Sequence, residues 1–392
     1  MPEPVEEAFA PTGWPEGFGE GPEERGAVAV LASLRGITPR NLHRLCWREE
    51  SASAALAAIR AGRAGSDADR AHALVTDADS IVGASSAAGA RFLTPHDDEY
   101  PSSVLELDDP PVALFVRGAR VDVSERRVAI VGARRCSSLG GEIARDLGRR
   151  LGSAGVCVVS GAAYGIDANS HRGALDAGGR TIAVLGSGID IGYPRSSADL
   201  ISRIAEAGSV VSEYAPGVPA EPHRFPARNR IVVALASALV VVEGAALSGS
   251  RISVDHALDL GRDVFAVPGS VTSPLAEVPL ALIRDGATMI RGADDLLHDL
   301  GVTVPAEGER PDPPIELPDN ERRAWSALAE PLLPDAVART ALLSLPDAVA
   351  ALIRLELRGL VRSAGGRYER TLLGVQARGD HPPADRRAPG SA

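Results

Sequence analysis

The chain has 392 residues, enough for two or three domains, and 45% of them are hydrophobic, so a large core can be buried. Its 41 basic and 52 acidic residues give a net charge of −11, which argues against a nucleic-acid binder that is basic over its whole surface. A local basic groove is compatible with this charge, because the field at a site depends on nearby groups. The sequence shows no apolar run that could span a bilayer and no signal-peptide pattern, so we expect a cytoplasmic protein without a membrane partner.

The first ninety residues fall into two segments of different composition. Residues 1–24 are rich in Pro, Gly and Glu, and we expect them to be disordered. Residues 25–90 predict a small helical domain, since Val28, Leu31 and Leu34 recur at helical spacing and a second helix begins near Pro39. This domain is either a SAM-like or helix-hairpin-helix element, whose turn amides can touch DNA phosphates, or a plain helical packing domain.

Residues 91–302 alternate short apolar strands with helices, which predicts an extended Rossmann-like α/β domain with a doubly wound parallel sheet. The strands are expected at 113–117, 128–131, 156–159, 181–185, 209–212, 238–242 and 264–267. At the centre of this domain lies the stretch 128–172, in which two strand–glycine–helix corners follow one another. Ser137 or Ser138 is expected to cap the helix of the first corner.

The two corners bring backbone amides and helix N-termini to one edge of the sheet, which suits a phosphate. The first corner carries Gly132, Arg134 and Arg135, and the second carries Ser160, Gly161 and Gly165. Two guanidinium groups in one corner favour an extended polyanion over a single nucleotide. The alternative is that the glycines only make turns and the arginines are solvated.

A second group of candidate residues lies in the stretch 222–250. Phenylalanine beside arginines is typical of single-stranded DNA binding, since bases stack on the ring and guanidinium groups hold the phosphates. An alternative role for Phe225 is core packing, and one for Arg230 is an ion pair with a carboxylate such as Glu213 or Glu243. The candidates are Phe225, Arg228, Asn229 and Arg230, followed by Ser248, Gly249 and Ser250 at the start of another helix.

The C-terminal residues predict a separate small domain. Residues 303–319 form a proline-rich acidic linker by composition, and residues 375–392 are expected to be a disordered tail. Residues 320–374 show three helical patterns and a Gly-Gly hairpin, which predicts a winged helix. Its recognition helix, 346–358, has only Arg354 and Arg358 as basic residues, so we place protein contact slightly ahead of DNA binding.

The sequence offers no persuasive catalytic set, so we expect no catalytic residues. It has no GxxxxGK[ST] motif, and the first corner lacks GxGxxG spacing, so no nucleotide cofactor is expected. Dispersed histidines and cysteines argue against a metal. Asp167 and His171 can pair on one helix face but lack a nucleophile, and Asp167 is expected to cap its helix or hold a loop.

The chain closely resembles the DNA-processing protein A family, DprA/Smf. The resemblance rests on VGARRCSSLGG, SGAAYGID, SEYAPG, FPARNR, SGSRIS and FAVPGS, which follow the family's order over about residues 92–300. It implies an extended Rossmann fold that binds single-stranded DNA, forms a homodimer and loads RecA onto incoming strands in natural transformation, without catalysis. The DNA-binding positions that it implies are Gly132, Arg134, Ser160, Gly161, Gly165, Phe225, Arg228, Asn229, Arg230, Ser248, Gly249 and Ser250.

The chain departs from the family's pattern at four positions. Ala133 replaces a usual serine, Tyr164 replaces a residue that is often basic or small, Pro222 stands where a basic residue is usual, and Asp255 adds a carboxylate. The last two changes predict weaker DNA binding.

Two other functions are weighed against single-stranded DNA binding. Related Rossmann folds include LOG-like phosphoribohydrolases that act on nucleotides and carry a PGGxGTxxE signature. Here SGS is followed by Arg251, and no glutamate stands at the required place. A third possibility is a protein that keeps the fold, has lost DNA binding and acts through the winged helix.

Overall fold

The computed structural model describes residues 12–121, 125–246, 249–302 and 317–371. The chain divides into two compact units, Met1–Thr303 and Val304–Ala392. Ser248, most of the predicted linker (303–316), residues 1–11 and the predicted tail (375–392) lie outside the described residues.

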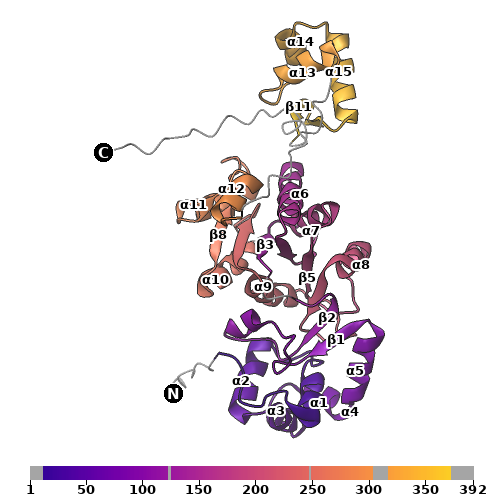
Figure 1. The fold of residues 1–392 in the computed structure, drawn as a ribbon, viewed down its shortest axis with the longest axis vertical. Coiled ribbons are helices and arrows are strands. Elements are labelled where there is room, and N and C mark those ends of the chain that lie inside the picture. The colour runs from indigo at the N-terminus through magenta and orange to yellow at the C-terminus, as the bar shows by residue number, and fades with distance from the viewer. Residues whose placement is uncertain (1–11, 122–124, 247–248, 303–316, 372–392) are drawn as a thin grey trace, which may run out of the picture. The chain divides into compact units, whose positions relative to one another are not determined.

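The first unit is built on a nine-stranded sheet with the order β1-β2-β6-β5-β4-β3-β7-β8-β9 (Figure 1). Strands β3 to β9 run parallel, whereas β1 pairs antiparallel with β2, and β2 with β6. The strands are β1 Ala90–Leu93, β2 Leu114–Gly118, β3 Arg127–Val131, β4 Cys157–Ser160, β5 Thr181–Leu185, β6 Ser209–Ser212, β7 Ala238–Val241, β8 Asp263–Ala266 and β9 Thr288–Met289.

The sheet is therefore mostly parallel, as expected, with an antiparallel edge that the sequence pattern did not predict. A parallel pair needs a long crossover, usually a helix. Between β1 and β2 lies only the short 3₁₀ helix η1 (Ser102–Glu106), and these strands pair antiparallel.

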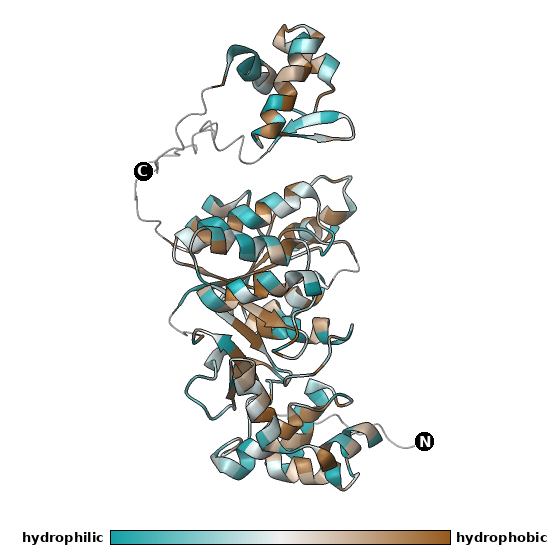
Figure 2. Cartoon of the chain, turned by 90° about the vertical axis from the view of Figure 1, so that its right-hand side faces the viewer, coloured by the Kyte–Doolittle hydropathy of each residue, from teal (hydrophilic) through white to brown (hydrophobic). Residues whose placement is uncertain are grey.

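Helices cover both faces of the parallel strands, which makes the sheet doubly wound. The apolar runs of β3, β4, β5 and β7 are buried throughout, and Figure 2 shows hydrophobic strands beneath helices with hydrophilic outer turns. One face packs against α6 Ser138–Ser153, α7 Ile166–Asp176, α8 Ala198–Ala207 and α12 Ala293–Asp299. The other packs against α9 Arg224–Ala234, α10 Ser250–Asp259 and α11 Glu277–Arg284.

The chain reverses its winding direction at β3. From β3 the chain adds β4, β5 and β6 on one side, and then returns to place β7, β8 and β9 on the other. In open α/β sheets, ligands bind outside the carboxyl ends of the strands at such a switch point. The fold therefore predicts a ligand site at the loops that follow β3, β4 and β7.

Among the described residues, five helices precede the sheet and pack on one end of it. They are α1 Gly21–Leu31, α2 Pro39–Glu49, α3 Ala52–Arg60, α4 Asp67–Val75 and α5 Ala78–Ala87. The expectation of disorder in residues 1–24 is wrong from residue 12 onward. Trp14 and Phe18 stack with ring centroids 4.2 Å apart, and Phe18 is buried. Glu24 also accepts the backbone N–H groups of Ala52 and Ser53, so aromatic packing and this carboxylate order a segment that composition alone marked as polar.

The second unit contains three helices and an antiparallel hairpin, and its assignment as a winged helix stays a prediction. Its elements are α13 Asp319–Ala327, α14 Pro334–Ala341, α15 Leu345–Leu357, β10 Val361–Ala364 and β11 Arg367–Arg370. Trp325 lies in the core beneath Arg370, whose guanidinium carbon is 3.7 Å from the ring centroid. Within the described residues no single helix is long and apolar enough to cross a membrane, although the bent pair α14 and α15 has that length and composition.

Candidate nucleic-acid interface

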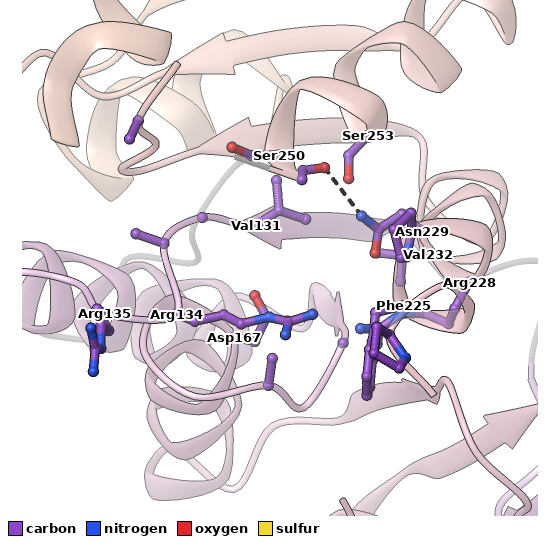
Figure 3. A pocket seen from close by; sticks show the side chains of 18 of the residues that line it. Val131, Arg134, Arg135, Asp167, Phe225, Arg228, Asn229, Val232, Ser250 and Ser253 are labelled. Carbon is purple, nitrogen blue, oxygen red and sulfur yellow. Dashed lines mark hydrogen bonds between the residues drawn. The ribbon is translucent and has the colours of Figure 1, made fainter. Parts of the chain in front are cut away.

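A pocket of about 370 Å³ opens at the switch point (Figure 3). Its walls come from the loop after β3, the β4–α7 corner, the start of α9 and the start of α10. The candidate residues that line it are Gly132, Arg134, Arg135, Gly161, Phe225, Arg228, Asn229, Gly249 and Ser250. Segments far apart in the sequence thus meet at one edge of the sheet.

Phe225 lies between a cation and a second aromatic ring. The guanidinium carbon of Arg134 is 4.7 Å from the centroid of the Phe225 ring, a cation–π distance. The Tyr193 ring lies 5.2 Å from Phe225 at an interplanar angle of 35°, and Tyr193 is 46% exposed. Phe225 itself is only half-buried, so the structure disfavours core packing as its role. Sequence reasoning missed Tyr193, although its Tyr-Pro pair directly follows a glycine corner.

The two arginines of the first corner point in different directions. Figure 3 shows Arg134 extending past Asp167 toward Phe225, whereas Arg135 points away from this group. Both side chains are exposed, and neither has a carboxylate partner within 4.0 Å among the described residues. Arg134 is therefore the cation that the fold aims into the pocket.

Arg228 lies in the pocket floor rather than on its surface. It is only 2% exposed, and its Nη1 donates to the backbone oxygen of Val184. Burial lowers the pKa of Arg228 to about 10, and the nearby Asp167 carboxylate partly offsets that effect. The guanidinium also fills the space that a Cβ at Gly161 would need. Arg228 thus places positive charge at the floor of the pocket. Glycine suits position 161 because the Arg228 guanidinium occupies the space that a Cβ would need.

Asp167 is a pocket residue that holds a loop instead of capping α7, which is the second of the two roles expected for it: its carboxylate accepts hydrogen bonds from the backbone N–H groups of Gly161 and Ala163. The N-cap of α7 is Gly165, and no side chain caps the helix. Burial raises the pKa of Asp167, while Arg228, the N–H of Ala163 and Arg134 act in the opposite direction. His171 does not provide a partner, because its Nδ1 lies 2.7 Å from the Thr181 hydroxyl. The Thr181 hydroxyl in turn donates to Val158, so His171 carries its proton on Nδ1.

Arg230 is not in the pocket, which corrects the prediction that it binds DNA. Its guanidinium is 3% exposed and forms ion pairs with Glu213 at 2.8 Å and Asp109 at 3.1 Å. Glu213 and Asp109 raise the pKa of Arg230 against the opposing effect of burial. The alternative that the sequence left open, an ion pair with Glu213, is the one observed.

The glycines of the corners are required by close packing. Gly165 has a φ of +75°, and a Cβ there would collide with the backbone oxygen of Ala133. A Cβ at Gly132 would lie 2.6 Å from Ile166 and 2.8 Å from the backbone oxygen of Glu243. Ser160 is buried and donates to the backbone oxygen of Ile130 at 2.6 Å, so its hydroxyl serves the sheet and is not a ligand.

A side-chain hydrogen bond links α9 to the α10 side of the pocket. Nδ2 of Asn229 donates to the backbone oxygen of Gly249 at 3.2 Å, which ties α9 to the start of α10 (Figure 3). Gly249 has open space around it, with only Nδ2 of Asn229 near a hypothetical Cβ at 3.9 Å. Of the departures from the family pattern, Pro222 lines the pocket, whereas Asp255 is exposed outside its lining.

The N-terminus of α6 is occupied by the protein's own carboxylate, which sequence reasoning missed. Ser137 is the N-cap, as expected, and accepts from Gly140 N at 2.9 Å. Glu243 accepts from Ser137 N at 2.8 Å and from Ser137 Oγ at 2.5 Å. We expected the helix N-terminus of the first corner to be open to a phosphate. The Glu243 carboxylate occupies it instead, which corrects that expectation.

Together these features define a Rossmann-like α/β protein with an arginine- and aromatic-lined pocket at its topological switch point. Residues 91–301 match the family model described as DNA recombination-mediator protein A. The chain belongs to this family, DprA/Smf, as its motifs indicated.

Individual relatives agree with this assignment. A DprA relative from Mycobacterium tuberculosis is 41% identical over 256 residues, which cover 61% of this chain and 66% of the relative. Protein Smf from Synechocystis is 35% identical over 319 residues, which cover 71% of this chain and 80% of Smf. The X-ray structure of DprA from Streptococcus pneumoniae matches with a TM-score of 0.60 and 30% identity, over 71% of this chain and 97% of that one.

Proposed function

We propose that this chain binds single-stranded DNA across the switch-point pocket and acts as a recombination mediator rather than an enzyme. The observation that carries the proposal is the position of Phe225 between Arg134 and Tyr193. Arg134 can hold a phosphate while a base stacks on the aromatic rings, and such stacking requires bases that are not paired in a duplex. The family description, DNA recombination-mediator protein A, supports the same class of function.

The pocket has the charge pattern that this function needs despite the acidic chain. Arg134, Arg135 and Arg228 line it, and Asp167 is the one acidic side chain among the described residues of its lining. Because guanidinium groups outnumber carboxylates there, positive charge is in excess where a phosphate would approach. The local field is therefore positive although the net charge of the chain is −11.

The further roles proposed for the chain rest on its family membership. They are assembly as a homodimer, loading of RecA onto the bound strand, a place in natural transformation and a cytoplasmic location. The nucleotide-hydrolase alternative gains no support from the described pocket, where Glu243 already fills the helix end at which a nucleotide phosphate would bind.

A direct test compares oligo-dT with a duplex of the same length by fluorescence anisotropy. We expect the full chain to bind the single strand more tightly, and Phe225→Ala to remove most of that preference. Phe92→Leu, which changes an aromatic residue in β1 outside the pocket lining, is the control and should keep the preference. Equal binding of both forms by the wild type would contradict the proposal.

A further inference from the structure

Glu243 is bound where a helix N-terminus would bind an anion. Helix α6 is 16 residues long and has no acidic residue in its own first turn. The carboxylate of Glu243, from the loop that directly follows β7, accepts two hydrogen bonds from Ser137, at 2.8 Å from the amide and 2.5 Å from the hydroxyl. A helix end of this kind favours negative charge, and phosphate groups commonly use it.

The half-buried Glu243 side chain lies close against the first turn of α6. A Cβ at Gly140 would collide with the Glu243 carboxyl group, so a larger residue there would displace the carboxylate from Ser137. The backbone is held on either side of Glu243, since Val242 N donates to Val131 O at 3.2 Å and Gly244 N donates to Leu275 O at 2.7 Å. The backbone around Glu243 is therefore held by β3 and by the 3₁₀ helix η3 (Pro274–Ala276), and its carboxylate by the start of α6.

We propose that Glu243 is an internal substitute for a phosphate and a specificity-determining residue of the pocket. By filling the α6 N-terminus, it excludes the terminal phosphate of free nucleotides from the first corner. By bonding Ser137, it also holds the short loop that carries Arg134, so that the guanidinium faces Phe225. With the helix end filled, the pocket contacts a phosphodiester backbone through its side chains. This proposal deepens the proposed function, and only its account of backbone contacts rests on DNA binding.

The test asks whether inorganic phosphate replaces the missing carboxylate. Glu243→Ala leaves a vacant helix end, so its melting temperature should fall and then rise with phosphate until the site saturates. Phosphate also stabilises folded proteins in general, because it is excluded from their surfaces. The gain is therefore measured relative to the wild type and to Glu213→Ala, which removes a buried carboxylate paired with Arg230 instead. Gains of equal size in all three proteins would overturn the proposal.

A second variant and a second measurement cover the case in which Glu243→Ala fails to fold. Glu243→Gln keeps the side-chain volume, so it should lose stability without gaining a specific response to phosphate. In the wild type, the amide resonances of Gly140 and Gly141 should not shift with phosphate, because the position is already filled. A saturable shift of these resonances would overturn the proposal. Neither readout uses DNA, so a failure to bind oligo-dT would refute the proposed function and leave this inference standing.

Discussion

The guanidinium of Arg134 lies over the ring of Phe225 at 4.7 Å, although Arg134 follows β3 and Phe225 lies in the first turn of α9. This contact joins the two segments that the sequence marked separately as candidate sites. It also orients a cation and an aromatic face into the same pocket, which is the combination that a flexible nucleic acid strand requires.

Replacing Phe225 tests the stacking part of the site. Phe225→Ala should weaken binding of oligo-dT by about tenfold or more, since a base stacked on an aromatic ring contributes roughly 1–3 kcal/mol. The dependence on salt should stay as in the wild type, because no charge is lost. Phe225→Tyr keeps a ring and should bind nearly as well. Anisotropy titrations at several salt concentrations measure both quantities, and an unchanged affinity in Phe225→Ala would exclude stacking at this residue.

The ion pair of Arg230 predicts a defect in stability. Arg230→Met should lower the free energy of unfolding by about 3–5 kcal/mol, because Glu213 is left buried without its partner. The double variant Arg230→Met, Glu213→Leu should recover much of the loss, because the fully buried carboxylate is removed and Asp109, the other partner of Arg230, is only half-buried and keeps contact with water. Urea unfolding measures all three proteins. If Arg230→Met were as stable as the wild type but bound DNA more weakly, Arg230 would belong to the DNA-binding site.

Most of the parallel strands were predictable from the sequence, whereas the antiparallel edge of the sheet and most of the contacts across the site were not. Strands β5 and β6 have the predicted bounds, because short apolar runs ending in glycine or serine corners leave little choice. The role of Glu243 depends on a helix end 106 residues earlier in the chain, a distance that local patterns do not report. Arg228 and Arg230 share one motif, yet helical rotation sends one beneath the pocket and the other to Glu213. Sequence alone left that difference open.

Alanine substitutions at Gly165 and Gly249, two glycines of the pocket region, should differ sharply in their effect on stability. Gly165→Ala should destabilise the protein by at least about 1 kcal/mol. Alanine would have to adopt a positive φ there, and its Cβ would collide with the backbone oxygen of Ala133. Gly249→Ala is the matched control, since its φ is −64° and its surroundings are open. Thermal and urea unfolding distinguish them. Equal effects of the two substitutions would contradict the packing described for the second corner.

The buried His171 predicts a loss of stability in acid. Burial lowers its pKa to about 3 from an ordinary value of 6.5, so the unfolded chain binds the proton first. The contribution of His171 is then complete above about pH 6.5 and declines as the pH falls toward about 3. Asp167, whose pKa is raised, acts in the opposite sense, so the comparison must be made between the wild type and His171→Gln. Their difference in unfolding free energy should shrink on acidification, and a constant difference would refute a neutral buried His171.

The central claim, that Arg134 holds the phosphate backbone at the switch point, is tested most directly by the salt dependence of oligo-dT binding in three proteins. The wild type should lose affinity steeply as salt rises, and Arg134→Ala should bind more weakly with a slope reduced by about one. Arg135→Ala removes an equal charge from the neighbouring position, where the side chain points away from Phe225, and should change the slope less. Equal slopes in the wild type and Arg134→Ala, or a larger effect of Arg135→Ala, would contradict the account.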